Sequence, residues 1–201
     1  MLANRSHLSN GLYMTEEQYL ALDDATDGKY EFYDGYVIML SPPSAAYDAH
    51  PLLDIAGGSV AHSALTARLT SLIDQELTDG PCLVHSSDVK LQISSPTHYF
   101  HPDVLVACGN EIGQLLTDVV VVIEVMSPAT EKRDRGVKLA VYKSLPSVQE
   151  YLLVGSESQE IVIHRRESDW RPYHYRSGDV VELTSIGVSF TFDAVYRRIA
   201  L

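Results

Sequence analysis

The sequence predicts an α/β (α+β) fold with a mixed central sheet flanked by helices and a C-terminal β-meander. Two helical patterns, at residues 59–78 and 131–145, are separated by strands, and largely apolar runs stand at 103–107, 119–125 and 150–154. Strands that are apolar at nearly every position are typical of a sheet that is covered on both faces. Short strand patterns between residues 160 and 183 predict the meander.

Length and composition predict a single domain that spans residues 1–201. The chain is 45% hydrophobic and 21% charged, and no repeat, low-complexity tract or linker divides it. Residues 1–14 contain no apolar stretch long enough for a signal sequence, and the run at 119–123 is far shorter than the ~20 residues that cross a bilayer. Cys82 and Cys108 lack the spacing of a metal cluster, so we interpret them as reduced core thiols. We therefore expect a cytoplasmic protein without membrane association.

The net charge of −12 argues against a protein that coats nucleic acid, because such binding depends on Lys and Arg side chains that neutralise phosphates. An enzyme whose acidic site binds a metal ion before it meets an anion is still compatible with this charge. The largest local exception is residues 131–138, with four basic and two acidic side chains. Net charge alone therefore disfavours DNA binding, and local charge leaves it open.

Local patterns place the first elements. Thr15 with Gln18 has the form of a capping box, which predicts that a short helix begins there. Residues 30–40 read as a hairpin that turns at Asp34-Gly35, since this pair tolerates the positive φ of a tight turn. The helix at 59–78 has Leu65, Leu69, Leu72 and Ile73 on one stripe.

Two acidic residues stand at the ends of predicted core strands. Asp103 follows Pro102 and precedes an apolar run, and Glu124 ends the run that begins at Val119. Buried carboxylates without partners are costly by several kcal/mol or more. If the two strands are neighbours, one Mg²⁺ bound to both acids would compensate their charge. The alternatives are an arginine partner for Glu124, or two carboxylates that point into solvent.

Lys138 lies on the apolar stripe of the second helix. Lys138, Val141, Tyr142 and Leu145 are spaced i, i+3, i+4 and i+7, whereas Lys143 points away from this stripe. We expect Lys138 at the edge of the core-facing side, where its ammonium could reach a scissile phosphate. The alternative is a partly exposed i, i+4 ion pair with Asp134, which contributes only ~0.2–0.5 kcal/mol.

Several motifs together carry a family resemblance. In chain order they are Tyr30-Glu31 with Asp34-Gly35, Pro102-Asp103-Val104, Ile123 to Pro128, Asp134-Arg135-Gly136 with Lys138 and Tyr142, and Glu150-Tyr151 with Leu153-Val154. With these motifs the chain resembles the Uma-type restriction endonucleases of the PD-(D/E)xK nuclease superfamily. The resemblance spans roughly residues 15–195 and is strongest from Pro102 to Val154.

The resemblance implies a restriction-endonuclease-like core in which Asp103 and Glu124 bind Mg²⁺, with Mn²⁺ as a substitute. The superfamily pattern has a lysine two residues after the second acid, but Met126 stands there in this sequence. Lys138 matches the lysine that the following helix supplies in the family resembled. Glu31 matches a family acid near the site and would be a further catalytic carboxylate. The alternative for Glu31 is a surface residue of the hairpin.

The chain departs from the family pattern at two places. The stretch from Ser41 to His62 is longer than the usual link before the first long helix, so we expect an inserted lid or dimer contact between Ser41 and Gly58. Gly155 stands where the family has an Asp after its buried strand. His62 shares the helix stripe, and we interpret it as a hydrogen-bonded histidine at the core edge, with a general base as the alternative.

Together these observations predict a Mg²⁺-dependent DNA endonuclease, a homodimer, with Asp103 and Glu124 as metal ligands and Lys138 and Glu31 as further catalytic residues. The alternative is a catalytically silent, dimeric module that binds nucleic acid or protein and keeps the nuclease fold. The retained Asp, Glu and Lys residues favour the enzyme, and the acidic net charge favours the silent module.

Overall fold

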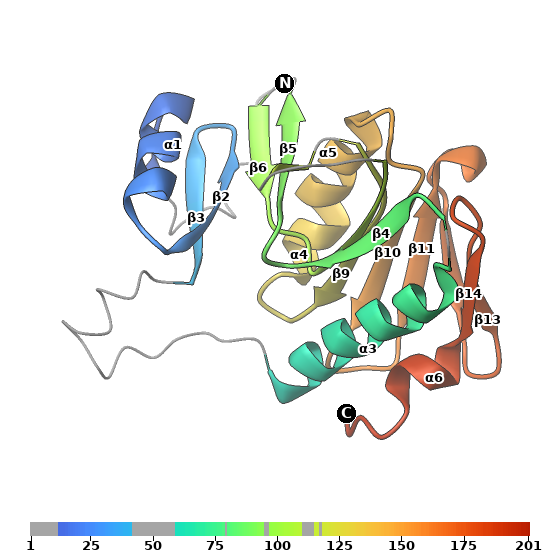
Figure 1. The fold of residues 1–201 in the computed structure, drawn as a ribbon. Coiled ribbons are helices and arrows are strands. Elements are labelled where there is room, and N and C mark those ends of the chain that lie inside the picture. Colours follow the sequence, from blue (N-terminus) through green and yellow to red (C-terminus); the bar gives the residue numbers. More distant parts are fainter. Residues whose placement is uncertain (1–11, 42–58, 79, 95–96, 110–114, 117) are drawn as a thin grey trace. The chain divides into compact units, whose positions relative to one another are not determined.

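The computed structural model describes residues 12–41, 59–78, 80–94, 97–109, 115–116 and 118–201 (Figure 1). The chain divides into two compact units. Unit 1 comprises residues 1–57 and 92–101, and unit 2 comprises residues 58–91 and 102–201. The single-domain organisation stays a prediction. The expected contact segment between Ser41 and Gly58 lies, apart from Ser41, outside the described residues.

Unit 1 is built from short strands and one helix. Its elements are β1 (Leu12–Tyr13), α1 (Glu16–Ala25), β2 (Lys29–Tyr33), β3 (Tyr36–Ser41), part of β5 (Lys90–Ser94) and β6 (Thr97–Phe100). They follow the order β1-β3-β2-β6-β5, and residues 90 and 91 of β5 belong to unit 2, where they pair in parallel with β8 (Leu115–Leu116).

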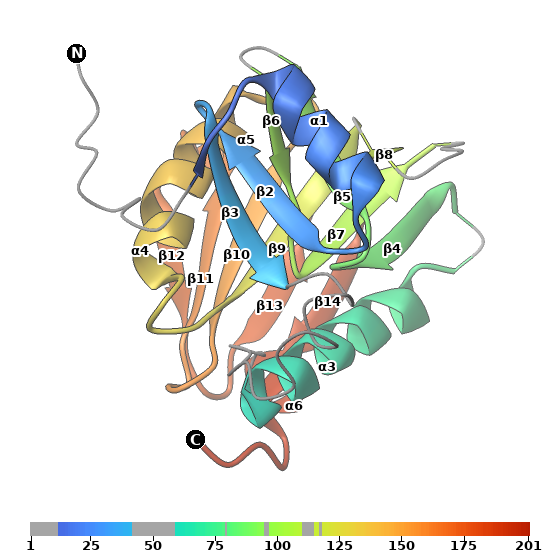
Figure 2. The same ribbon diagram turned by 90° about the vertical axis from the view of Figure 1, so that its left-hand side faces the viewer.

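The expected local signals of unit 1 are confirmed. Thr15 and Gln18 form both hydrogen bonds of a capping box at the start of α1. Asp34 and Gly35 have φ values of 51° and 83°, so both central residues of the β2–β3 turn are left-handed, as a two-residue hairpin requires. α1 lies beside these strands (Figure 2). A small, mainly aromatic core joins the helix to them, with Tyr19, Tyr30, Phe32, Val37 and Tyr99 buried.

Unit 2 contains the larger sheet. Its other elements are α3 (Val60–Glu76), β4 (Cys82–Ser86), β7 (Val104–Cys108), β9 (Val119–Met126), α4 (Glu131–Arg133), η1 (Asp134–Lys138), α5 (Leu139–Ser144), β10 (Glu150–Gly155), β11 (Ile161–Arg165), η2 (Arg166–Ser168), β12 (Pro172–Tyr175), β13 (Val180–Leu183), β14 (Val188–Thr191) and α6 (Phe192–Tyr196).

The strand order of this sheet is β12-β11-β10-β9-β7-β4. β9 and β10 pair in parallel, and the other neighbours pair antiparallel, so the sheet is mixed as predicted. β10, β11 and β12 form the C-terminal meander. The segment at 180–183 does not extend it, because β13 pairs with β14 in a separate hairpin.

The two faces of the sheet receive different covers. Val121, Ile123 and Val125 of β9 pack with Leu65 and Leu69 of α3 in the main hydrophobic core. The β13–β14 hairpin and α6 also contribute to this core. Because side chains alternate along a strand, Glu124 must face the opposite side, which the segment from α4 to α5 covers (Figure 1).

The helix expected at 131–145 is interrupted. Asp134–Lys138 forms a π-helical segment, η1, between the short helices α4 and α5. A π-helix bonds i to i+5 and is common at functional sites. Asp134 and Lys138, at the two ends of η1, are both buried. The residues predicted to lie on the core-facing stripe are therefore buried as expected, but part of the helix that carries them is π-helical and not α-helical.

Cys82 and Cys108 form a disulfide between β4 and β7, where they are directly paired in the antiparallel register. The interpretation as reduced core thiols is therefore wrong for this structure. The sequence spacing of 26 residues hides the pairing, because only strand register brings the two cysteines together. No helix in the described ranges is long and apolar enough to cross a membrane. The cytoplasmic location stays a prediction, without the support of free thiols.

We expect reduction of Cys82–Cys108 to lower the free energy of unfolding by ~2–4 kcal/mol, because the closed loop restricts the unfolded chain. Denaturant unfolding with and without dithiothreitol measures this difference. A Cys82→Ser/Cys108→Ser double variant is the control and should not respond to the reductant. Titration of two free thiols in protein purified without reductant would contradict the disulfide.

Candidate active site

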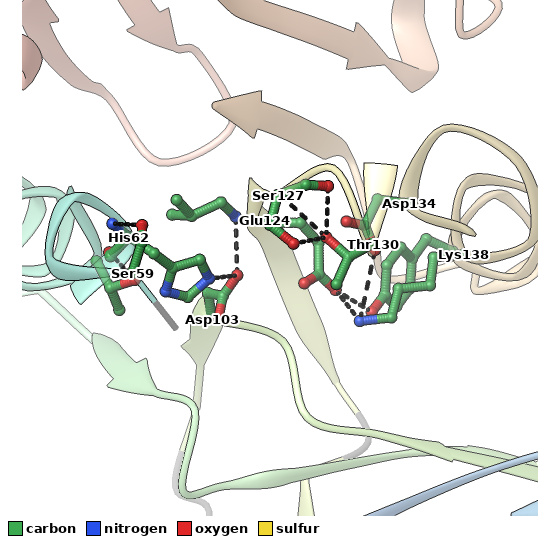
Figure 3. A network of polar contacts seen from close by, with 11 residues as sticks. Ser59, His62, Asp103, Glu124, Ser127, Thr130, Asp134 and Lys138 are labelled. Atoms are coloured by element: carbon green, nitrogen blue, oxygen red, sulfur yellow. Dashed lines mark hydrogen bonds and ion pairs between the residues drawn. The ribbon is translucent and has the colours of Figure 1, made fainter. Parts of the chain in front are cut away.

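Glu124 is the buried acid of the larger sheet. It lies near the end of β9 and is 3% exposed. Its Oε1 accepts hydrogen bonds from Nζ of Lys138, at 2.7 Å, and from the hydroxyl of Tyr142, at 2.9 Å (Figure 3). The expectation that a lysine of the following helix points back to Glu124 agrees with this geometry, and the alternative of an arginine partner does not.

Lys138 is more deeply buried than the sequence predicts. The side chains of Lys138 and Glu124 are 2% and 4% exposed, and Asp134 Oδ1 lies 3.9 Å from the same Nζ. The i, i+4 pair with Asp134 is therefore present, but it is buried and not partly exposed, and Glu124 is the nearer carboxylate. Lys143, in contrast, is exposed, as expected from the stripe.

Tyrosines hold this cluster in place. Tyr142 packs on Tyr151 of β10 with ring centroids 5.0 Å apart, and the Tyr151 hydroxyl donates to the backbone oxygen of Asp134 at 3.1 Å. The π-helical segment is therefore tied to the sheet at both Asp134 and Lys138. Tyr142 belongs to the family motifs, but its hydrogen bond to Glu124 was not predicted. Its position four residues after Lys138 on the same stripe was the available signal.

Asp103 stands one residue before β7 and is partly exposed. Its Oδ2 accepts the amide of Val125 at 2.8 Å and lies 3.3 Å from Nε2 of His62 on α3. Val104 of β7 pairs with Ile123 of β9, so Asp103 directly precedes, and Glu124 directly follows, a residue of this pair. The hydrogen bond with Asp103 raises the pKa of His62, against the lowering effect of burial, and the negative charge of Asp103 adds to the increase.

A groove of about 900 Å³ leads to Asp103. Its walls are the face of α3 from His62 to Asp74, Val84 and Ser86 of β4, and the following Ser87. The described residues that line it include several hydroxyl groups and two aspartates but neither Lys nor Arg. Among the described residues that line the groove, His62 is the one whose side chain can carry positive charge.

Glu31 lies in unit 1, on β2, and is 0% exposed. Its Oε1 accepts the amide of His101, two residues before Asp103 in the chain, at 3.1 Å. The alternative of a surface residue on the hairpin is therefore wrong. Its participation in catalysis stays a prediction.

Asp103 and Glu124 are the candidate ligands for a metal ion. Among the described residues, no group of three or more His, Cys, Asp or Glu side chains is arranged to hold a metal. Mg²⁺, however, is commonly bound through one or two carboxylates, with waters and substrate phosphates completing its shell. Asp103 and Glu124 supply hard oxygen donors of this type, and Lys138 and Tyr142 both bind Oε1 of Glu124. The donor atoms of the two acids are therefore of the type that Mg²⁺ prefers, and the binding of one ion by both stays a prediction.

The mixed sheet and its two covering layers define a restriction-endonuclease-like fold. A crystal structure described as "a putative nuclease belonging to DUF820" from Anabaena variabilis ATCC 29413 matches with a TM-score of 0.66 at 16% identity. The match covers 85% of this chain and 91% of that one. The predicted fold class is confirmed.

The family model described as "Uma2: Putative restriction endonuclease" matches residues 52–194, and the chain belongs to this family. Two proteins of Synechocystis sp. (strain ATCC 27184 / PCC 6803 / Kazusa) are similar. Uncharacterized protein slr1290 is 35% identical over 93% of both chains, and uncharacterized protein sll1609 is 27% identical over 78% of this chain and 82% of its own. The suspected family is confirmed.

Because the Glu124–Lys138 pair is buried, we expect Lys138→Ala to lower the free energy of unfolding by ~3–5 kcal/mol, as removal of one partner leaves an uncompensated carboxylate. Lys143→Ala, of equal charge change on the same helical segment, should stay within ~0.5 kcal/mol of the original protein. Denaturant unfolding measures both.

A double-mutant cycle isolates the contact. Lys138→Ala should have a smaller effect in a Glu124→Ala background, because the buried carboxylate is then absent. Equal effects of Lys138→Ala in both backgrounds would show that the two side chains do not interact.

Proposed function

We propose that this protein is a Mg²⁺-dependent DNA endonuclease, with Mn²⁺ as a substitute ion. The observation that carries the proposal is the 2.7 Å contact between Lys138 and Glu124, next to the strand that begins after Asp103. The contact supports the proposal because a PD-(D/E)xK-like site needs an acid and a lysine close together, here with the lysine from the helical segment after β9. The family description supports nuclease chemistry.

Asp103 and Glu124 would hold the metal ion, which supplies a bound water of lowered pKa and offsets charge on the phosphate. Their surroundings differ. Glu124 is enclosed by Lys138 and Tyr142, whereas Asp103 borders the open groove. Ligation of one ion would thus join a rigid, buried carboxylate to one that solvent and substrate can reach.

Lys138 would stabilise the negative charge that develops on the phosphate during hydrolysis. A cation that is already fixed by Glu124 needs little reorganisation at the moment of reaction, and its effect is large where water is excluded. Met126, at the position where the superfamily has its lysine, is apolar and buried, so it cannot supply this charge. Lys138 is the lysine in contact with Glu124.

The absence of Lys and Arg from the described groove lining bears on how DNA would bind. A phosphate that entered the groove would meet Asp74 and Asp103, which repel it. Metal binding at Asp103 would reverse this local charge, so we expect DNA to bind weakly without a divalent ion. The acidic net charge of −12 points in the same direction.

We expect supercoiled plasmid to be cleaved in the presence of Mg²⁺ or Mn²⁺, and not after addition of EDTA. Asp103→Asn, Glu124→Gln and Lys138→Ala should each lower the rate by ~10²–10³, the effect of removing a preorganised electrostatic group. Lys143→Ala should cleave at the original rate. Gel analysis of nicked and linear products measures the activity.

Stability must be separated from chemistry in this assay. Since Lys138→Ala also destabilises the fold, cleavage is measured at a temperature where circular dichroism shows the variant folded, and Lys138→Met serves as a second variant that fills the same space. Cleavage by Lys138→Met at the original rate would contradict the role of the lysine. No cleavage of any tested DNA by the original protein would favour the silent binding module.

We also propose a homodimer, because a nuclease of this size that cuts both strands commonly presents two active sites, and two-fold dimers are the commonest symmetric assemblies. Light scattering at micromolar concentration should give about twice the 22.3 kDa chain mass. A deletion within residues 42–58 tests whether this segment takes part in the contact. A monomeric mass for the chain without this deletion would exclude the dimer.

A further inference from the structure

His62 contacts Asp103 although the sequence does not place it in the site. Its Nε2 lies 3.3 Å from Oδ2 of Asp103, and the two side chains are 22% and 17% exposed. The amide of Val125 donates to the same oxygen at 2.8 Å. One oxygen of this carboxylate is therefore engaged twice, by α3 from one side and by β9 from the other.

The second oxygen of Asp103 is differently placed. Within the part of the chain that the structure describes, Oδ1 has no hydrogen-bond or ion-pair partner. A carboxylate held through one oxygen presents the other in a defined direction, and such outer contacts orient metal ligands in proteins. Asp103 thus has the arrangement of a ligand that is oriented before the ion arrives.

The position of His62 is set by the start of α3. Ser59 is the N-cap, and its Oγ accepts the amide of His62 at 3.1 Å (Figure 3). The hydroxyl of Thr66 donates to the carbonyl of His62 at 3.0 Å. The backbone amide and the carbonyl of His62 are thus both hydrogen-bonded to side chains of α3 or its N-cap. The imidazole therefore approaches Asp103 from a rigid backbone.

His62 and Asp103 also line the same groove. Glu124 and Lys138 are buried and do not belong to the described lining of this groove, so a ligand in the groove meets the His62–Asp103 pair. His62 is therefore placed to act on the accessible acid, and not on the enclosed one.

We propose that His62 is a positioning residue of the metal site, which donates from Nε2 to Oδ2 of Asp103 and thereby directs Oδ1 toward the ion. This inference rests on the proposed function, because it needs Asp103 to be a metal ligand. It assigns His62 neither contact with the ion nor proton transfer. In the neutral imidazole this hydrogen bond requires the proton on Nε2.

Gln and Asn at position 62 both carry an amide donor, but they place it differently, so together they test where the donor must lie. The amide nitrogen of Gln occupies the place of Nε2, whereas that of Asn occupies the place of Nδ1. His62→Gln should therefore retain the hydrogen bond, and His62→Asn and His62→Ala should lose it. Thr70→Ala is the matched control, since Thr70 lines the same groove two turns further along α3.

Binding of Mn²⁺ without DNA is the measurement, with free Mn²⁺ followed by electron paramagnetic resonance. We expect His62→Ala and His62→Asn to weaken Mn²⁺ binding by ~10–100-fold, the usual effect of losing a residue that orients a ligand. His62→Gln and Thr70→Ala should bind like the original protein. If His62→Ala does not fold, the comparison of Gln with Asn at this position gives the same answer.

The possible failures are distinguishable. Asp103→Asn should abolish Mn²⁺ binding, and if it does so while His62→Ala and His62→Asn bind normally or more tightly, the role of His62 is overturned and the proposed function stands. Failure of Gln to restore binding would also overturn it. If Asp103→Asn binds Mn²⁺ normally, Asp103 is not a ligand, and both the proposed site and the role of His62 are overturned.

Discussion

The buried contact between Lys138 and Glu124 is the interaction on which the rest of the larger unit depends. Both side chains are almost fully enclosed, so each would be strongly destabilising without the other. The contact fixes where the helical segment after β9 must lie, because a lysine with a 2.7 Å contact leaves little freedom for η1. The hydroxyl of Tyr142 completes the compensation on the same carboxylate oxygen.

This requirement is met by an irregular helix. Asp134 and Lys138 bracket η1, and Tyr151 binds the backbone of Asp134 from β10. A π-helical segment is stable only where tertiary contacts compensate its weaker local geometry, and here these contacts are polar and buried. The same residues that neutralise Glu124 thus also hold the covering layer on the sheet.

The two acids of the proposed site lie in contrasting environments beside a single sheet. Side chains alternate along β9, so Ile123 and Val125 enter the apolar core under α3 while Glu124 enters the polar cluster on the other face. Asp103 precedes its strand and lies at the groove. β7 is attached at both ends, through Asp103 to Val125 and through Cys108 to Cys82, as the role proposed for Asp103 would require.

Much of this organisation follows from the sequence. Apolar periodicity predicts the buried strands and α3, turn chemistry predicts the hairpin at Asp34-Gly35, and the stripe of Lys138 and Tyr142 predicts which side of the helix faces the sheet. These features are local, since they depend on side-chain spacing within one element. The family motifs add the pairing of Asp103, Glu124 and Lys138 as a hypothesis.

Tertiary structure decided the features that depend on register and burial. Three contacts join residues that are far apart in the chain: the disulfide between Cys82 and Cys108, the contact of His62 with Asp103, and the hydrogen bond of the buried Glu31 with the amide of His101. The depth of Lys138 also could not be read from its stripe, because spacing defines a direction around the helix axis but not the distance to solvent. That distance is set by the sheet, the π-helical turn and the tyrosines that close over the ion pair.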